Sequence, residues 1–455
     1  MKYYIQTLGC AMNYSDTERV SSMLEKLGYE KTETPEDADI YIFNTCSIRQ
    51  KGEDRVYGQY QNVAGWKKSN PRLLIGITGC MVRNTSTKNT ERENQDHLLK
   101  LLDQLDFVFR INDTHKLGEV LSEAEPRLEI PELEEGGLND YLRVKPKYQV
   151  AHQAFVPIQI GCDKYCTYCI VPYARGREKS RPMQDIIAEC TDLVEKGCKE
   201  ITLVGQTVNS YGKSVLDEQD GQFAHLKDPF VSLLEELDKL TEKGLNRLRF
   251  TSPHPRDYNE NLIEAHARLQ CLTPHFHLPI QAGDDQMLQK MNRQYTFEKY
   301  KKLIDKIREI LPEASVTTDI IVGFCGETDE QFENTVKAYN NVRWDMAYLA
   351  RYSPRKGTVS WKAFKDDVSR EKKAERWHKL NKLLEACSRE YNESMTGKTL
   401  EVLVEKFDNE TGLAEGKSRE NKIVQFPGAP DLIGHVVNVK ITNALTWTLK
   451  GEKIS

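Results

Sequence analysis

The feature that most constrains this chain is a run of three cysteines, Cys162, Cys166 and Cys169, spaced as C-x3-C-x2-C in one short segment. Three thiolates in one loop suit a cubane iron–sulfur cluster and leave one iron without a protein ligand. A structural zinc site normally takes four ligands, and no fourth ligand lies nearby in the sequence. The run therefore favours an iron–sulfur cluster with an open iron over a zinc site.

The remaining cysteines do not indicate disulfides. The chain has eleven cysteines, an odd number, and its first residues lack the basic segment and apolar run of a signal peptide. No stretch approaches the ~20 apolar residues that span a bilayer, so we expect a cytoplasmic protein with no membrane attachment and reduced thiols. Five scattered cysteines are expected to be buried packing residues: Cys190, Cys198, Cys271, Cys325 and Cys387.

A second set of cysteines follows strand-like segments near the amino terminus. Three apolar runs suit buried parallel strands: residues 2–8, 39–44 and 73–78. Each run is followed two residues later by a cysteine: Cys10, Cys46 and Cys80. A helical pattern covers residues 15–27, with Ser15 as its expected N-cap. Because sites in open α/β sheets form beyond the carboxyl ends of the strands, these three thiols could converge at one edge.

The centre of the chain alternates strand and helix. Six strands are predicted: residues 156–160, 200–204, 247–251, 275–279, 316–321 and 346–352. Helical patterns lie between them: residues 185–196, 231–241, 297–310 and 330–340. A longer charged helix is predicted over 370–392. This alternation predicts a partial (β/α)6 barrel, with the cysteine run just after the first barrel strand, at the end where barrels place active sites.

The carboxy-terminal part reads as a small antiparallel β-barrel. Four short strands are predicted between turn residues: residues 399–405, 414–416, 422–426 and 435–442. The predicted domains are 1–124 (open parallel α/β), 149–390 (barrel) and 391–455 (small β-barrel). Segment 125–148, a mixture of Glu, Pro, Gly and Leu without a clear period, is predicted to be a linker.

The cysteine run resembles that of the radical S-adenosylmethionine (SAM) superfamily. Tyr168, directly before the third cysteine, matches the superfamily pattern and is thereby expected near the SAM adenine. The resemblance implies that the open iron binds the amino and carboxylate groups of SAM. Other candidate SAM contacts follow barrel strands: Gln206, Asn209, His277, Gln281 and Gly323. Each has an alternative reading, because loop Gln and Asn often only cap a turn and a strand-end His is often only a satisfied polar residue.

Both cysteine sets and the terminal barrel together resemble the methylthiotransferase family over essentially the whole chain. The resemblance implies an amino-terminal cluster domain, a radical-SAM barrel and a TRAM domain. It further implies that Cys10, Cys46 and Cys80 hold a second [4Fe-4S] cluster whose open iron carries the sulfur to be transferred. Two SAM molecules per turnover, an electron donor such as flavodoxin or ferredoxin, and a sulfur or cluster-repair donor are also implied. We expect a monomer.

Local segments favour the MiaB-type branch, which methylthiolates N6-isopentenyl(dimethylallyl)adenosine beside the tRNA anticodon. The segments are 8–13, 44–51, 79–81, 171–176 and 180–182. Three departures from the usual pattern touch no cluster ligand: Val82-Arg83, Ala282 and Cys325. Sibling enzymes acting on threonylcarbamoyl-adenosine or on a ribosomal-protein aspartate are the nearest alternatives. A non-catalytic iron–sulfur protein that binds RNA is a more remote one.

An RNA partner must be held by local patches, because the net charge is −5. The target base, in the anticodon loop of the tRNA, can be splayed out and extruded into a pocket. Candidate phosphate-binding residues lie in three places: Arg49; Arg175, Arg177 and Arg181 with Lys179; and Lys417, Arg419 and Lys422. The alternative for both clustered patches is a solvated surface charge run.

Overall fold

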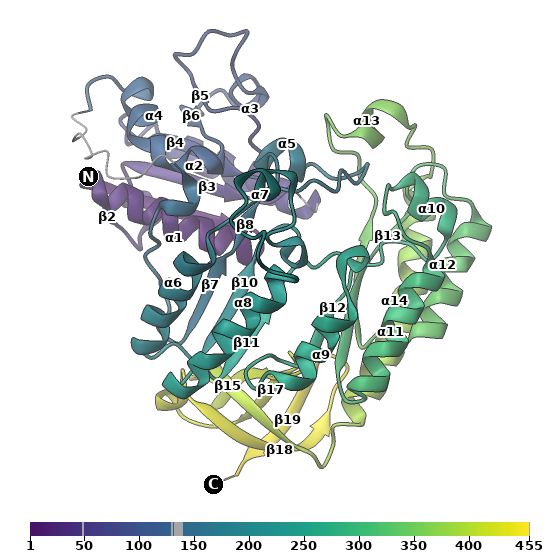
Figure 1. Ribbon diagram of the computed structural model, residues 1–455. Coiled ribbons are helices and arrows are strands. Elements are labelled where there is room, and N and C mark those ends of the chain that lie inside the picture. Colours follow the sequence, from purple (N-terminus) through teal and green to yellow (C-terminus); the bar gives the residue numbers. More distant parts are fainter. Residues whose placement is uncertain (48–49, 129–130, 132–139, 455) are drawn as a thin grey trace.

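The structure, a computed structural model, describes residues 1–47, 50–128, 131 and 140–454. Three parts follow one another along the chain (Figure 1), and they match the predicted architecture. An amino-terminal sheet in purple and blue lies above an open barrel in teal and green, and a small yellow barrel lies beneath it.

The amino-terminal sheet has the strand order β2-β1-β3-β4-β6-β5, with β5 as its antiparallel edge. Its strands are β1 (Lys2–Leu8), β2 (Glu30–Lys31), β3 (Ile40–Thr45), β4 (Leu74–Gly79), β5 (Ser86–Thr87) and β6 (Phe107–Val108). Its helices are α1 (Ala11–Lys26), α2 (Gln50–Trp66), α3 (His97–Leu101) and α4 (Leu117–Ala124). Side chains of α1 and α4 share one hydrophobic core, and those of α2 and α3 share another. Apolar residues on both faces of β3 and β4 account for this three-layer arrangement.

Helix α1 begins earlier than the sequence predicts. Its N-cap is Cys10, whose backbone N–H donates to Asn13 Oδ1 at 3.1 Å. Ser15, the expected N-cap, is buried inside the helix and accepts a hydrogen bond from Arg19 Nη1 at 2.8 Å. The prediction of Ser15 as the cap was wrong because a thiol and an asparagine side chain cap this helix instead.

The described end of segment 125–148 is packed rather than loose. Tyr141, Leu142 and Val144 are buried in the core that also contains α1. Ile160 and Val204, which belong to the central barrel, complete the same core. The amino-terminal domain is therefore joined to the barrel by shared apolar packing as well as by the chain.

The central barrel consists of two parallel three-stranded sheets, β11-β10-β7 and β12-β13-β14. Its strands are β7 (Gln153–Pro157), β10 (Glu200–Val204), β11 (Arg247–Phe250), β12 (His275–His277), β13 (Ser315–Val322) and β14 (Met346–Arg351). The two sheets are not joined by a ladder; an isolated bridge, Leu248 with Leu272, connects β11 to the segment before β12. The predicted strand 156–160 is divided, since β8 (Gln159–Ile160) pairs instead with β9 (Lys179–Ser180).

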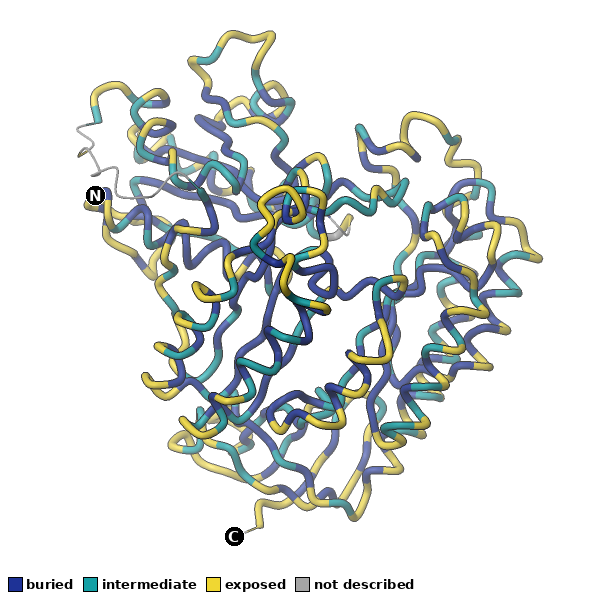
Figure 2. Tube along the Cα trace, viewed as in Figure 1, coloured by how far each residue is buried: buried dark blue, intermediate teal, exposed yellow. Residues whose placement is uncertain are grey.

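Helices cover the outside of this barrel. They include α6 (Met183–Glu195), α8 (Pro229–Asp238), α9 (Glu260–Arg268), α11 (Phe297–Ile310), α12 (Asp329–Val342) and α14 (Arg370–Glu393). Figure 2 shows buried residues along the strands and exposed residues on the outward faces of these helices. Cys190, Cys198, Cys271 and Cys325 are buried in the barrel core and Cys387 packs against it, which confirms their expected packing role. Within the described ranges no helix is long and apolar enough to cross a membrane.

The terminal barrel closes with five strands, one more than predicted. They are β15 (Thr399–Asp408), β16 (Leu413–Ser418), β17 (Ile423–Pro427), β18 (Val436–Ala444) and β19 (Thr448–Lys453). This domain packs against the amino ends of the central strands. Arg247 Nη2 donates to the Glu401 carbonyl at 2.9 Å, and Arg249 Nη2 donates to the Ser418 carbonyl at 2.7 Å. The terminal barrel therefore lies at the opposite end of the central strands from the amino-terminal sheet (Figure 1).

Candidate active site

The contiguous cysteines form a loop between β8 and the short helix α5 (Val171–Arg175). Gly161 opens the loop with φ +83°, and a Cβ there would lie 2.0 Å from the Arg177 carbonyl oxygen. Its N–H donates to Gln206 Oε1 at 2.6 Å. Inside the loop, Tyr165 adopts φ 49°, a left-handed conformation that is uncommon for a non-glycine residue. Backbone geometry and one glutamine side chain thus set the shape of this loop.

Polar groups approach the sulfurs of this loop. The Thr207 hydroxyl lies 3.3 Å from Cys162 Sγ, and Arg293 Nη1 donates to Cys166 Sγ at 3.3 Å. Burial raises the pKa of Cys162 to about 11 and raises that of Cys169 further. Shielded thiols with hydrogen-bond donors aimed at sulfur suit thiolates that are neutralised by metal binding.

The donor set fits a cluster better than a single ion. In a cubane cluster each thiolate binds a different iron, so its ligands need not converge on one point. The loop supplies three thiols and the sequence offers no fourth ligand beside them, which suits a cubane with one open iron.

The dispersed cysteines come together at the carboxyl ends of β1, β3 and β4. A hydrogen bond with Cys46, helped by the charge of Arg175, lowers the pKa of Cys10 to about 6. Burial raises the pKa of Cys80, against the opposing effect of Arg175, and the charge of Cys10 adds to the rise. Cys10 is exposed, Cys46 is half-buried and Cys80 is buried. Three thiols from separate strand ends therefore line one site, the arrangement that the parallel sheet makes possible.

A glycine shapes the approach to Cys80, as Gly161 does for the contiguous set. Gly79 has φ +92°, and a Cβ there would lie 2.3 Å from the Thr45 carbonyl oxygen. That close approach brings the β3 and β4 ends together, where Cys46 and Cys80 follow. The two cysteine sets thus share one local device, a left-handed glycine directly before a cysteine.

The two sets face one another across the domain junction. Arg175, the last residue of α5, donates from Nε to Cys80 Sγ at 3.4 Å. Burial and the charges of Cys166 and Cys162 raise the pKa of Cys169. The charge of Cys80 adds to this rise, so Cys80 lies near the contiguous set. The carboxyl ends of both sheets are therefore directed at a common region.

Strained backbone gathers on the same side of the barrel. Seven non-glycine residues of the described chain have positive φ, and five of them lie in the cysteine loop or in loops at the carboxyl ends of barrel strands. These five are Tyr165, Ser252, Gln281, Asn292 and Gln294. Asn292 Nδ2 donates to the Lys164 and Tyr165 carbonyls at 3.2 and 3.0 Å, which fixes the cysteine loop from outside. Such outliers concentrate at functional sites, where surrounding structure holds them in place.

Two of the candidate SAM contacts, Gln206 and Asn209, hold the backbone of neighbouring loops. Gln206 holds the Gly161 N–H, and Asn209 is clamped to both backbone polar groups of His254 at 2.8 and 2.9 Å. The Asn209 side chain thus matches its alternative reading as a loop-fixing residue. Tyr168 meets Phe324 edge-on, with ring centroids 6.3 Å apart.

The other three candidates lie at the ends of β12 and β13. His277 contacts Asp319 Oδ2 at 3.2 Å and Thr317 Oγ1 at 3.0 Å. Gln281 joins β13 through a bridge to Ile320, and the Gly323 N–H donates to Glu327 Oε2 at 2.7 Å. These positions surround the mouth of the barrel, and direct contact with SAM stays a prediction.

The basic segment beside the cysteine loop differs from its predicted role. Arg175 and Arg181 are buried and paired with carboxylates: Arg175 with Asp16 at 2.5 Å and Arg181 with Glu189 at 2.6 Å. Neither side chain is open to a phosphate, because its guanidinium is occupied inside the domain junction. Arg177 remains about half exposed and pairs with Asp163.

The second basic patch lies mostly against the central barrel. Arg419 donates to the carbonyls of Asn246 and Gln270 at 3.1 and 2.8 Å. Lys422 Nζ lies 4.3 Å from the centre of the Tyr391 ring, and burial lowers its pKa to about 8. Lys417 alone of the three keeps a side chain that is 41% exposed. Arg419 and Lys422 therefore connect the domains, and Arg49 lies outside the described residues.

Two arginines that the sequence did not single out belong to the site. Arg293 reaches Cys166, and its Nη2 also donates to the Pro279 carbonyl at 2.9 Å. Arg355, in the loop after β14, donates from Nε to the Ser47 carbonyl at 2.8 Å. The contacts of Arg293 with Cys166 and of Arg355 with Ser47 join residues more than a hundred positions apart, so no local pattern could have indicated them.

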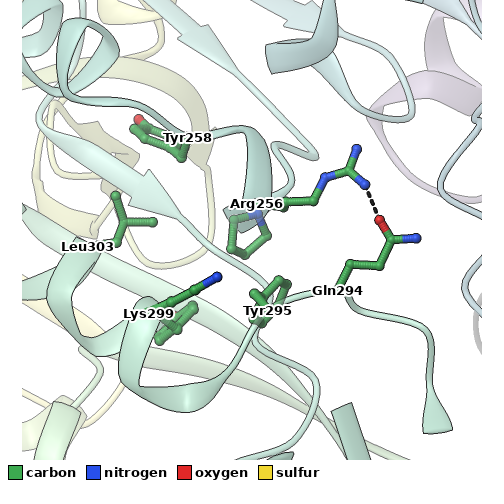
Figure 3. A pocket seen from close by; sticks show the side chains of 8 residues that line it. Arg256, Tyr258, Gln294, Tyr295, Lys299 and Leu303 are labelled. Carbon is green, nitrogen blue, oxygen red and sulfur yellow. Dashed lines mark hydrogen bonds between the residues drawn. The ribbon is translucent and has the colours of Figure 1, made fainter. Parts of the chain in front are cut away.

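A surface cavity lies apart from the cysteines. It has a volume of about 240 Å³ and is lined by residues of the loop after β11, of the loop after α10 (Asp285–Lys290), and of α11. Figure 3 shows Arg256 and Gln294 bridging one side of it, with Tyr295 and Lys299 beside them. No cysteine lines this cavity, although Tyr295 of its lining accepts a hydrogen bond from Arg293, which contacts Cys166.

Three families of known proteins match successive parts of the chain. Residues 156–339 match the Radical SAM superfamily, residues 2–100 the uncharacterized protein family UPF0004, and residues 393–454 the TRAM domain. In fold, the chain is similar to the radical SAM methyltransferase TsrM from Kitasatospora setae, with a TM-score of 0.53 and 14% identity over 77% of this chain and 72% of that one. The protein is a radical-SAM enzyme.

Closer relatives narrow the class to a family. The chain is 42% identical to the tRNA-2-methylthio-N(6)-dimethylallyladenosine synthase of Anoxybacillus flavithermus, over 100% of this chain and 83% of the relative. The Bacillus subtilis protein of the same name is also 42% identical, over 100% of this chain and 86% of the relative. The chain belongs to the family of tRNA-2-methylthio-N(6)-dimethylallyladenosine synthases.

Proposed function

We propose that this enzyme replaces the C2 hydrogen of N6-dimethylallyladenosine in tRNA, beside the anticodon, with a methylthio group. The observation that carries the proposal is the convergence of two three-cysteine sets at the junction of two domains, with Arg175 reaching Cys80 from α5. The names of relatives that match the entire chain support the substrate. Methylthiolation of threonylcarbamoyl-adenosine or of a protein aspartate is less favoured, since those relatives carry neither name.

Each set would hold one [4Fe-4S] cluster. Cys162, Cys166 and Cys169 would bind the cluster that meets SAM, and the dispersed set would bind the cluster that bears sulfur. When bound, these groups would supply the electron that cleaves SAM and the sulfur for transfer; SAM ends as methionine and 5′-deoxyadenosine once the C2 hydrogen of the base has been taken up. One SAM is cleaved and a second gives its methyl group, so two are used per product.

The protein's own residues position and enclose this chemistry. Thr207 and Arg293 place donors on two of the loop sulfurs. Arg110 donates to the Ala174 carbonyl at 3.3 Å on one side of the junction, and Arg355 holds the Ser47 carbonyl on the other. The amino-terminal domain is thus attached to the barrel at two separated places. This closure would limit water around the reacting base.

Substrate recognition requires a splayed nucleotide, because the C2 position of a stacked base is out of reach. Arg177 and Lys179, each about half exposed, lie beside the cysteine loop and are the best-placed phosphate contacts. The TRAM domain, at the far end of the barrel, would contact a more distant part of the tRNA. A flavodoxin or ferredoxin as electron source, a separate sulfur donor and a cytoplasmic site of action complete the proposal.

The test is a product analysis. Anaerobically reconstituted enzyme is incubated with SAM, a reductant and tRNA bearing N6-dimethylallyladenosine, and the digested nucleosides are weighed. We expect the mass of that adenosine to increase by one methylthio group in place of hydrogen. Cleavage of SAM with the nucleoside unchanged would contradict the substrate assignment, and tRNA bearing threonylcarbamoyl-adenosine would then be compared.

A further inference from the structure

One buried guanidinium connects the two cysteine sets. Arg175 is 1% exposed, and its Nε donates to Cys80 Sγ at 3.4 Å. The other side of the same group pairs with Asp16, with Nη1 and Nη2 at 3.3 and 2.5 Å from the two carboxylate oxygens. Paired in this bidentate way, the guanidinium has a fixed plane and direction.

Both partners of Arg175 lead to the dispersed set. Asp16 lies in α1, the helix that Cys10 caps, and its Oδ1 also accepts the Tyr141 hydroxyl at 2.6 Å. Cys80 is the most buried cysteine of the set. A single side chain from the barrel domain therefore contacts one thiol of this set and the helix that carries another.

The backbone of Arg175 is fixed as firmly as its side chain. It is the last residue of α5, which follows Cys169 closely. Asn112 Nδ2 donates to the Arg175 carbonyl at 2.9 Å, and Arg110 holds the preceding carbonyl. The position of the guanidinium is thus set by the contiguous cysteine loop on one side and the amino-terminal sheet on the other.

We propose that Arg175 is a positioning residue that fixes the dispersed cysteine set relative to the contiguous one and places a permanent positive charge beside the Cys80 sulfur. This inference rests on the proposed function, since it assumes a cluster at Cys10, Cys46 and Cys80. Arg175 touches no substrate. Its charge acts on the cluster ligand, where donors to sulfur raise the reduction potential.

The positive charge of Arg175 distinguishes the proposed role from a purely structural one, because packing alone would not supply a charge beside the Cys80 sulfur. A positive group beside a thiolate ligand favours the reduced, more negative state of the cluster. Its removal should therefore lower the midpoint potential of the dispersed cluster. Arg181 provides a matched control, because it is also a buried arginine of the domain junction but pairs with Glu189 and the Pro157 carbonyl.

The experiment measures that potential without tRNA. In full-length protein with Cys162, Cys166 and Cys169 replaced by Ala, only the dispersed cluster remains, and its midpoint potential is followed by EPR during redox titration. Arg175→Gln should shift the potential downward, Arg175→Lys should restore part of the shift, and Arg181→Gln should leave it unchanged. Asp16→Asn/Arg175→Gln removes both charges and keeps a foldable junction if the single variant is unstable.

A second readout uses protein with all six cysteines. Arg175→Gln should form 5′-deoxyadenosine at near the parent rate while the methylthio product falls roughly tenfold, the usual effect of losing a partner of a metal ligand. An unchanged potential in Arg175→Gln, or an equal shift in Arg181→Gln, would overturn the inference. Iron missing from the dispersed set of the parent would overturn the proposed function with it. Failure to modify the tRNA base alone would leave the measured potentials standing.

Discussion

The two cysteine sets reach similar arrangements by different routes. Cys162, Cys166 and Cys169 lie in one loop, whose shape comes from Gly161, Gln206 and neighbouring backbone. The dispersed thiols instead follow three separate strands and depend on a sheet, a helix N-terminus and a second domain. The contiguous set lies in one loop, whereas the dispersed set comes together only after the amino-terminal sheet has folded.

Because of this difference, we expect the two sets to lose their iron in response to different substitutions. The contiguous set should tolerate loosening of the domain junction, because its ligands share one loop. The dispersed set should respond to changes far from any cysteine, since Arg175 and Arg355 approach it from the barrel. Substitutions can therefore separate the two sets without touching a ligand.

The largest effect is expected from a ligand of the contiguous set. Cys162→Ala should abolish formation of 5′-deoxyadenosine, and with it the methylthio product, while the dispersed set keeps its iron. Chromatography of the SAM products and iron analysis measure this. Cys190→Ala, which removes a buried packing cysteine, is the control and should retain both clusters. Continued SAM cleavage in Cys162→Ala would break the assignment of roles.

The paired glycines allow a sharper comparison. The added Cβ would lie 2.0 Å from a carbonyl oxygen in Gly161→Ala and 2.3 Å from one in Gly79→Ala. Both positions also have positive φ, so we expect each substitution to cost about 2 kcal/mol or more. We expect Gly161→Ala to lose iron mainly from the contiguous set and Gly79→Ala mainly from the dispersed one. EPR of each reconstituted variant distinguishes these results. Gly58→Ala, in α2 with nothing near its Cβ, is the control, and loss of both clusters from either variant would contradict the separation.

Much of the fold could be predicted because it depends on local pattern. The predicted helix over 297–310 and the strand over 200–204 match α11 and β10 residue for residue, since their apolar spacing is regular. Strand β19 was missed because its two buried positions are Leu449 and Gly451, and glycine adds no apolar side chain to the alternating pattern. Local periodicity thus identified elements whose buried face is marked by large apolar residues.

The candidate site was predictable only in its cysteines. The basic segment was predicted to contact phosphate, yet Arg175 and Arg181 are buried and pair with Asp16 and Glu189. Arg293 and Arg355 gave no signal, since their partners lie far away in the chain. Contacts between distant segments decide the roles of Arg175, Arg293 and Arg355, and spacing within one segment carries no information about them.

A smaller effect is expected at the far attachment of the amino-terminal domain. Arg355 donates to the Ser47 carbonyl at 2.8 Å and to Gln50 Oε1 at 2.6 Å. Arg355→Ala removes both hydrogen bonds, at a cost of about 1–3 kcal/mol. We expect faster loss of iron to a chelator from the dispersed set and an unchanged rate from the contiguous set. Arg351→Ala, an exposed arginine of β14, should change neither rate. Equal acceleration at both sets would show that the sets are not separately supported.

The smallest effect concerns the terminal domain, which contacts neither set. Burial lowers the pKa of Lys422 from its ordinary value of 10.5 to about 8. The unfolded state then binds more protons between those values, so this group makes stability increase as pH rises from about 8 to 10.5. Lys422→Met should remove this increase, at most about 3 kcal/mol in the free energy of unfolding measured by heat or denaturant. Iron content should not change, and an identical pH slope in the variant would contradict the account of this contact.

The most direct test of the account replaces one ligand of the dispersed set. Cys46→Ala protein is reconstituted, its iron is counted, and 5′-deoxyadenosine and the modified nucleoside are measured in one reaction with tRNA bearing N6-dimethylallyladenosine. Two separate clusters with divided roles predict about half the parent's iron, continued formation of 5′-deoxyadenosine, and no methylthio product. Loss of SAM cleavage in a folded Cys46→Ala protein, or methylthio product at the parent level, would contradict it.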